Sequence, residues 1–117
     1  MIRDESRNDL GSVRIHKNVI ASISSIASLE IEGVQRVGAN IKSSLLELVG
    51  QKSFLAIKVD ISKNEEVKVD IPLVIKYGYN IPDVANRVQE NVRQALEKMS
   101  NLSIKEINVN VQGIERG

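Results

Sequence analysis

Cysteine is absent from the sequence, and histidine occurs once, as His16. Without cysteine the chain can form no disulfide bond, thiolate metal site, iron–sulfur cluster or cysteine nucleophile. His16 has no second histidine or cysteine with which to complete a metal or catalytic site, and near a helix start it would cap the helix or face solvent. The sequence therefore predicts a protein that is not an enzyme and has no cofactor.

Aromatic residues are few, and neither charge sign is in clear excess. Phe54, Tyr77 and Tyr79 make up 3% of the chain, whereas RNA-binding sheets stack bases on aromatic side chains interleaved with basic ones. The 16 basic and 15 acidic residues leave a net charge of +1, which exerts no long-range pull on nucleic acid or an anionic membrane. We expect no nucleic-acid partner.

No apolar run approaches the length of a membrane span. The first residues, MIRDESRNDLGS, are charged from the third position onward and lack the apolar core of a secretion signal. These absences predict a cytoplasmic protein with no direct membrane insertion, so that any membrane association goes through a partner or a surface helix. The 117 residues, 42% of them hydrophobic, suffice for one domain at 11–114, with a flexible tail at 1–10 and a short tail at 115–117.

The first half of the chain predicts one clear helix. After a short alternating run at Val13 and Ile15, residues 17–29 carry apolar side chains at helical spacing, at Val19, Ile20, Ile23, Ile26 and Ala27. Small residues flank that stripe, at Ala21, Ser22, Ser25 and Ser28. They either let another backbone approach closely or face water, and we favour water because serine is common on exposed faces. A short strand or extended link then begins at Gly33, and residues 41–49 fit one face of a short helix.

Residues 55–77 alternate in the manner of an antiparallel hairpin with one buried face. The inward positions of its second strand are Val67, Val69, Ile71, Leu73, Ile75 and Tyr77, and the outward positions are Lys68, Asp70, Pro72, Val74 and Lys76. Because Pro72 cannot donate to a β-ladder, this strand is either an edge strand or carries a bulge at that position.

A second helix and a last strand complete the predicted architecture. The helix holds apolar spacing for about five turns, at Ile81, Val84, Ala85, Val88, Val92, Ala95, Leu96 and Met99. The strand covers residues 103–114 and turns Ile107, Val109 and Val111 inward. The simplest fold that buries every stripe is α+β: a two-layer sandwich with a mixed, mostly antiparallel sheet and two amphipathic helices on one face.

A glycine-bracketed polar turn, YGYNIPDVANRVQ, joins the hairpin to the second helix and could hold a ligand. Backbone N–H groups at a helix start bind anions, but Gly78 and Asn80 also supply the backbone freedom and the N-cap of an ordinary turn. Asp83, in the first turn of the helix, would repel an anion. We favour a structural turn and keep a small ligand near residues 78–84 as the alternative. The structural turn residues are Gly33, Val34, Gly78, Asn80 and Pro82.

Two kinds of surface are candidates for protein binding. The outer face of the second helix carries opposite charges at i, i+4 spacing, although such a face is also typical of plain solvent exposure. The second hairpin strand and the last strand could each offer a sheet edge to an identical chain, with Val74 as an outward apolar residue. The candidate interaction residues are Val74, Asp83, Arg87, Glu90, Arg93 and Glu97.

Three stretches resemble the alkaline shock protein family, the general-stress or envelope-stress family of Gram-positive bacteria. They are GSVRIHKNVIASISSIASLEIEGVQRV, VKVDIPLVIKYGYNIPDVANRVQENVRQALEKM and LSIKEINVNVQGI, within residues 10–114. The most specific pieces are the pair Gly33 and Val34, the YGYNIPDVANRVQ turn and the closing INVNVQGI. Residues 40–54 match poorly, and His16 stands where members of the family more often carry a small hydroxyl residue.

The resemblance implies a small, non-enzymatic, often self-associating protein that is linked to cell-envelope homeostasis. Some members are held at the membrane by a separate anchor protein, and others are encoded near enzymes of fatty-acid or lipid metabolism that they are proposed to modulate. We therefore expect a cytoplasmic homo-oligomer that scaffolds envelope partners, such as a membrane-anchor protein, in a stress response. The alternative is a regulatory subunit of a lipid-metabolism enzyme. The resemblance brings no catalytic residues.

Overall fold

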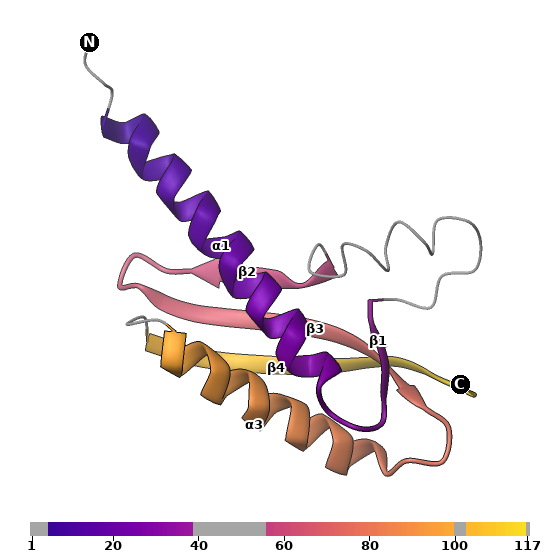
Figure 1. Ribbon diagram of the computed structural model, residues 1–117. Helices are drawn as coiled ribbons and strands as arrows, with labels where there is room; N and C mark the ends of the chain where they lie inside the picture. The colour runs from indigo at the N-terminus through magenta and orange to yellow at the C-terminus, as the bar shows by residue number, and fades with distance from the viewer. Residues whose placement is uncertain (1–4, 39–55, 100–102, 117) are drawn as a thin grey trace, which may run out of the picture.

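The computed structural model describes residues 5–38, 56–99 and 103–116, with the side chains of the first helix from Lys17 onward. In chain order its elements are α1 (Glu5–Leu29), β1 (Val34–Val37), β2 (Lys58–Ile61), β3 (Glu66–Lys76), α3 (Ile81–Met99) and β4 (Ser103–Glu115). Both helices cover the same face of a four-stranded sheet (Figure 1). The α+β two-layer fold is therefore confirmed, while the short helix predicted at 41–49 lies outside the described residues.

β3 is the central strand of the sheet. On one side, β2 pairs antiparallel with its first half, from Val67 to Asp70, and β1 pairs antiparallel with its second half, from Leu73 to Ile75. On the other side, β4 runs parallel to β3 along its whole length. Parallel neighbours need a crossover connection, which α3 provides between β3 and β4. The sheet is mixed as predicted, and both the hairpin of β2 with β3 and the last strand are confirmed.

Pro72 lies within this central strand, so of the two predicted alternatives the edge strand is wrong, whereas the bulge agrees with a register shift next to this position. The N–H of Gly38 donates to the carbonyl of Pro72 at 2.9 Å, which places that carbonyl on the side of β1 and β2. The N and C=O of one strand residue point to the same side, so the missing N–H of Pro72 faces the interval between the segments that pair with β2 and with β1. A register shift against β4 follows directly, between Leu73 and Val74.

α1 begins at Glu5, earlier than the predicted start at residue 17. Val13 and Ile15 are helical, because two alternating positions are too few to specify a strand and an existing helix extends at the gain of one backbone hydrogen bond per residue. The helix also takes in residues 5–10, which the sequence placed in a tail. Figure 1 shows this N-terminal part of α1 running out past the sheet.

Three of the four flanking small residues of α1 face the interior and the fourth, Ser22, is half-buried, so the favoured prediction that they face water is wrong for Ala21, Ser25 and Ser28. Ser24 and Ser28 are fully buried, and Ala21 and Ser25 nearly so. The hydroxyls of Ser24 and Ser28 each donate to the carbonyl four residues earlier, at 2.7 Å, so their burial leaves neither hydroxyl unpaired. Ile26, which the apolar stripe placed inward, is 62% exposed. α1 therefore packs on small side chains, which lets its backbone lie close to its neighbours.

The core lies between the helices and the sheet. β3 contributes its alternate residues from Val67 to Ile75, and α3 contributes four side chains at i, i+4 spacing, Val84, Val88, Val92 and Leu96. Full burial of those four stabilises the fold by an upper estimate of about 8 kcal/mol. Tyr77, predicted inward, is instead 63% exposed, and the Arg116 guanidinium lies 4.6 Å from its ring centroid.

Val74 is fully buried, so the prediction of an exposed apolar residue at this position is wrong. Its neighbours in register are Arg36 on β1 and Gly113 on β4. The Arg36 guanidinium donates two hydrogen bonds of 2.6 Å to the carboxylate of Glu115, so this ion pair joins β1 to β4 across β3. Bidentate pairs of this kind are among the stronger charge contacts in proteins. Val74 thus lies between two paired strands, and no free sheet edge is available at this residue.

Candidate functional site

The residues expected to form structural turns lie in and beside two neighbouring turns at one end of the helical layer, one joining α1 to β1 and the other joining β3 to α3 (Figure 1). Val34 is the first residue of β1. Gly33 and Gly78 have φ angles of 104° and 95°, in the left-handed region that favours glycine. The side-chain oxygen of Asn80 accepts the N–H of Asp83 at 2.9 Å and so caps α3. Pro82 follows in the first helical turn, where a missing N–H costs no helical hydrogen bond.

The space around Gly33 is filled by the protein's own side chains. A Cβ atom at Gly33 would stand 2.8 Å from Val84 Cγ2 and 2.9 Å from Tyr79 Cδ2. The Tyr79 hydroxyl donates to the carboxylate of Glu32 at 2.9 Å, and this bond raises the pKa of Tyr79 above its ordinary value. The close packing favours a structural role for this turn. A small ligand near residues 78–84 remains a prediction.

The charged residues predicted on the outer face of α3 lie in two different surroundings. Asp83 and Arg87 form an ion pair at 3.4 Å with both side chains more than half exposed, and Glu90 and Glu97 are exposed as well. Arg93 instead turns toward the sheet and donates to a main-chain carbonyl of β4 at 3.3 Å. An exposed i, i+4 pair contributes only about 0.3–0.5 kcal/mol, so the Asp83 pair adds little to stability.

β4 is an edge strand in the part of the chain that the structure describes. It pairs with β3 and with no second strand there. α3 covers the first half of its outer side, because Gln89 donates to the carbonyl of Ile107 at 2.6 Å and Arg93 reaches the same half of the strand. The second half runs on to Glu115, with Asn110 and Gln112 exposed. Main-chain groups on an unpaired edge can add a further strand.

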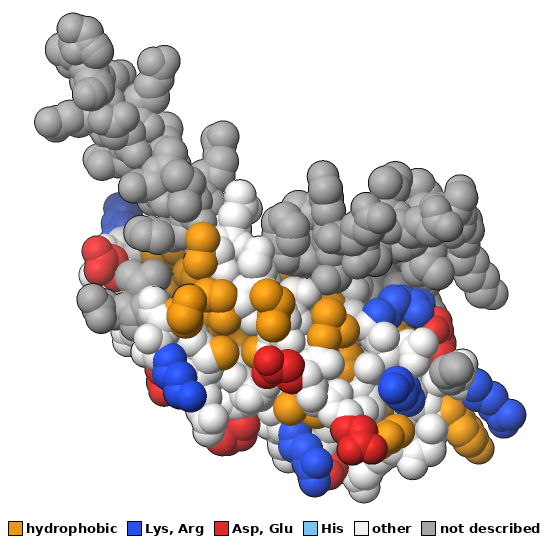
Figure 2. Space-filling model, viewed as in Figure 1, with side chains coloured by type: hydrophobic (Ala, Val, Ile, Leu, Met, Phe, Trp, Pro, Cys, Tyr) orange, Lys and Arg blue, Asp and Glu red, His pale blue; other side chains and the backbone are white. Residues whose placement is uncertain are grey.

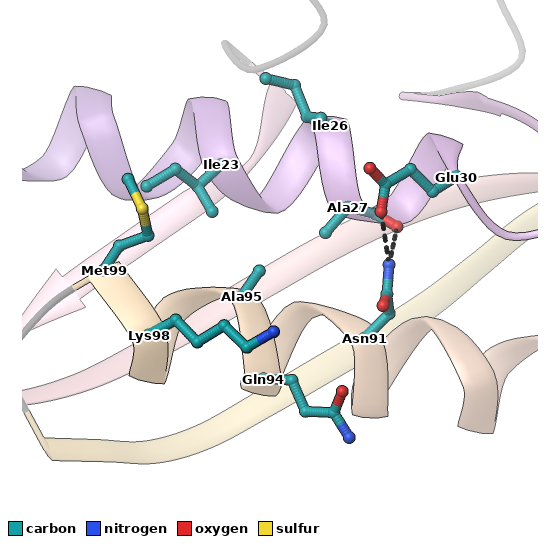
Figure 3. Close-up of a pocket in the computed structure, with 9 residues that line it drawn as sticks. All are labelled: Ile23, Ile26, Ala27, Glu30, Asn91, Gln94, Ala95, Lys98 and Met99. Carbon is teal, nitrogen blue, oxygen red and sulfur yellow. Dashed lines mark hydrogen bonds between the residues drawn. The ribbon is translucent and has the colours of Figure 1, made fainter.

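A groove of about 320 Å³ lies between α1 and α3 on the outer surface of the helical layer (Figure 3). Ile23, Ala27 and Ala95 line its deeper part, while Ile26 and Met99 stand at its margin, 62% and 66% exposed. Figure 2 shows apolar side chains gathered along the middle of this face, with Lys, Arg, Asp and Glu around them. Contiguous apolar surface of this kind is typical of interaction sites.

Polar residues mark the two ends of the groove. At one end, the Asn91 side-chain amide donates to the carbonyl of Ala27 at 2.8 Å and to the carboxylate of Glu30 at 3.0 Å, which ties the end of α1 to α3. At the other end lie Lys98 and Met99 (Figure 3). Glu30 and Lys98 are the two charged residues among the nine that line the groove. The groove therefore offers apolar contact area together with one acidic and one basic group, which suits binding.

The sequence did not predict this groove. Its apolar stripes placed Ile26 and Met99 in the core together with their neighbours. Periodicity shows which side chains share one face of a helix, but it does not show how much of that face the rest of the protein covers. The signal that was present is the small size of Ala27 and Ala95. These two residues come from opposite helices and leave the space between the helices unfilled.

The described residues were also compared with the requirements of a metal site and of a membrane-spanning helix. They contain no group of three or more histidine, cysteine, aspartate or glutamate side chains placed to hold a metal ion. Over the same ranges, no helix combines the length and the apolar character needed to cross a membrane. The side chain of His16 is not among those described.

Comparison with known proteins gives one family and several relatives. The model of the alkaline shock protein 23 family, described as having a cell envelope-related function, matches residues 5–116. The Bacillus subtilis protein named "Uncharacterized protein YqhY" is 37% identical over 113 residues, which cover 96% of this chain and 83% of that protein. A Streptococcus pyogenes "stress response regulator gls24 homolog" is 25% identical over 109 residues, 90% of this chain and 59% of its own length. No solved structure gives a significant match.

Proposed function

Because this chain belongs to the alkaline shock protein 23 family, whose described function is cell envelope-related, we propose that it is a non-catalytic scaffold that assembles with itself and with envelope partners. The relative named as a stress response regulator homolog supports a role in the stress response. In this proposal the scaffold acts in the cytoplasm and reaches the membrane through a partner such as a membrane-anchor protein. It acts through surfaces that bind other proteins, and nucleic acid is not among its partners.

The observation that carries the proposed self-association is the uncovered second half of the β4 edge. Beyond Ile107, where the Gln89 side chain covers the strand, β4 continues to Glu115 without a second strand beside it in the described chain. Two such edges can pair antiparallel about a two-fold axis, since the same main-chain groups then serve both copies. The exposed side chains of Asn110 and Gln112 are neutral and do not oppose that approach.

Placing lysines on this edge tests the proposal. The double variant Asn110→Lys and Gln112→Lys should weaken self-association by at least about tenfold, because two paired edges would bring the added positive charges together. Light scattering and sedimentation over a range of concentrations measure the effect. Asn18→Lys with Asn64→Lys adds the same charge at exposed positions away from the second half of β4 and should leave association unchanged. A concentration-independent monomer of the unmodified protein would contradict self-association altogether.

A regulatory subunit of a lipid-metabolism enzyme is the second candidate, because it too would work through protein surfaces. Capture of the tagged protein from its native cells separates the two, with membrane and soluble fractions crosslinked apart and identified by mass spectrometry. We expect a small membrane protein in the membrane fraction, absent from a tag-only control. Recovery of a soluble lipid-synthesis enzyme at comparable yield would instead favour the regulatory subunit.

A further inference from the structure

The groove between α1 and α3 carries charges that a second copy of the same groove complements. Glu30 and Lys98, its two charged lining residues, come from opposite ends, and the Lys98 side chain runs along α3 so that its ammonium group lies toward the middle, near Gln94 (Figure 3). A two-fold axis in the plane of contact, midway between them, exchanges their positions between two copies. Each Glu30 then faces a Lys98 of the other copy. We propose that this groove is the contact surface of a two-fold symmetric dimer of this chain.

The apolar side chains fit the same arrangement. Ile26 and Met99 stand at the margin of the groove and are 62% and 66% exposed, which is more than their size and apolar character favour in water. Ala27 and Ala95 leave hollow space between them that a marginal side chain of a second copy can enter. Large exposed side chains and small recessed ones therefore occur together on one face, as a self-complementary contact requires.

Charge complementarity favours a second copy as the occupant over a partner segment of a single charge sign. A partner segment of one charge sign would meet a like charge at either Glu30 or Lys98, and like charges across an interface oppose association. A second copy satisfies both charges at once. This inference rests on the proposed self-association but uses the helical layer, so it can be tested apart from the β4 edge.

A charge-swap experiment tests the dimer. Glu30→Lys alone and Lys98→Glu alone each place two pairs of like charges in the contact, and each should weaken self-association by at least about tenfold. An equimolar mixture of E30K and K98E protein should restore it, because every pair across the mixed contact is again opposite. Sedimentation equilibrium of the two variants and of their mixture provides the measurement. Glu65→Lys and Lys63→Glu, in the turn between β2 and β3, serve as controls of equal charge change.

A second variant covers the case in which E30K disturbs the fold by removing an acceptor of Asn91. Ile26→Ser with Met99→Ser should weaken association while leaving the thermal unfolding of the monomer nearly unchanged, because both side chains are mostly exposed. The dimer is overturned if the mixture of E30K and K98E stays as weak as either variant, or if I26S/M99S associates like the unmodified protein. Loss of association in N110K/Q112K with none in the groove variants would leave the β4 edge as the sole contact.

Discussion

Replacing Gly33 by alanine is expected to lower the free energy of unfolding by about 3 kcal/mol, the largest loss we predict for a single methyl group. At φ 104° any residue with a Cβ is strained, and here the added atom would also meet Val84 Cγ2 at 2.8 Å and Tyr79 Cδ2 at 2.9 Å. The carbonyl of Gly33 accepts the N–H of Lys76 at 2.8 Å, so the residue cannot move away without releasing β3. Urea denaturation followed by circular dichroism measures the loss.

Gly78→Ala is the matched control for this prediction. Gly78 has a similar φ of 95°, but a Cβ there would meet nothing within 4 Å. Its replacement should therefore cost only the backbone strain, about 1–2 kcal/mol. The difference between the two variants isolates the contact of Gly33 with α3. Equal losses in both would show that the close approach of Gly33 to Val84 and Tyr79 contributes nothing to stability.

β3 and α3 could be predicted from the sequence because each has a long uninterrupted pattern. β3 alternates over most of its length, and α3 repeats its apolar positions over nearly five turns, so neither depends on its neighbours for recognition. The position of β3 in the sheet was not predictable in this way. It depends on β1 and β2 sharing one side of the strand. This arrangement leaves an interval where Pro72 is tolerated, and it buries Val74.

The candidate sites also divide into those that local sequence patterns predict and those that depend on the placement of distant segments. The cap of α3 by Asn80 and the i, i+4 pair of Asp83 with Arg87 follow from local spacing, and both are present. The groove and the β4 edge arise from the relative placement of segments far apart in the chain. Asn91 and Glu30, for example, are joined by a hydrogen bond across 61 residues, which no local pattern indicates.

α1 shows most clearly how a local preference can be outweighed by packing. Serine is more common on exposed surfaces, yet Ser24 and Ser28 are fully buried while Ile26 is 62% exposed. The serine hydroxyls are satisfied within the helix by carbonyls four residues earlier, so their desolvation carries no unpaired group. What the position then requires is a small side chain, and hydrophobicity matters less than volume.

That requirement predicts the effect of enlarging Ser28. Ser28→Leu should destabilise the fold by about 3 kcal/mol, at the upper end for overpacking, because the site is fully buried and the helix backbone lies close to its neighbours. Ser28→Ala keeps the volume small and removes only a hydroxyl bonded to Ser24 O at 2.7 Å, so it should change stability by less than about 1 kcal/mol. Thermal and urea unfolding of both variants measure the difference.

Ile26→Leu gives the matched change on the exposed side of α1, where an apolar residue of equal size should have almost no effect on stability. If S28L were as stable as the unmodified protein, α1 would not pack on its small residues, and its apolar stripe would have to turn inward. Ile26 would then leave the margin of the groove, and the proposed dimer contact would lose one of its two exposed anchors. A large loss in S28L with none in S28A fixes the rotation of α1 that places Ile26 at the groove.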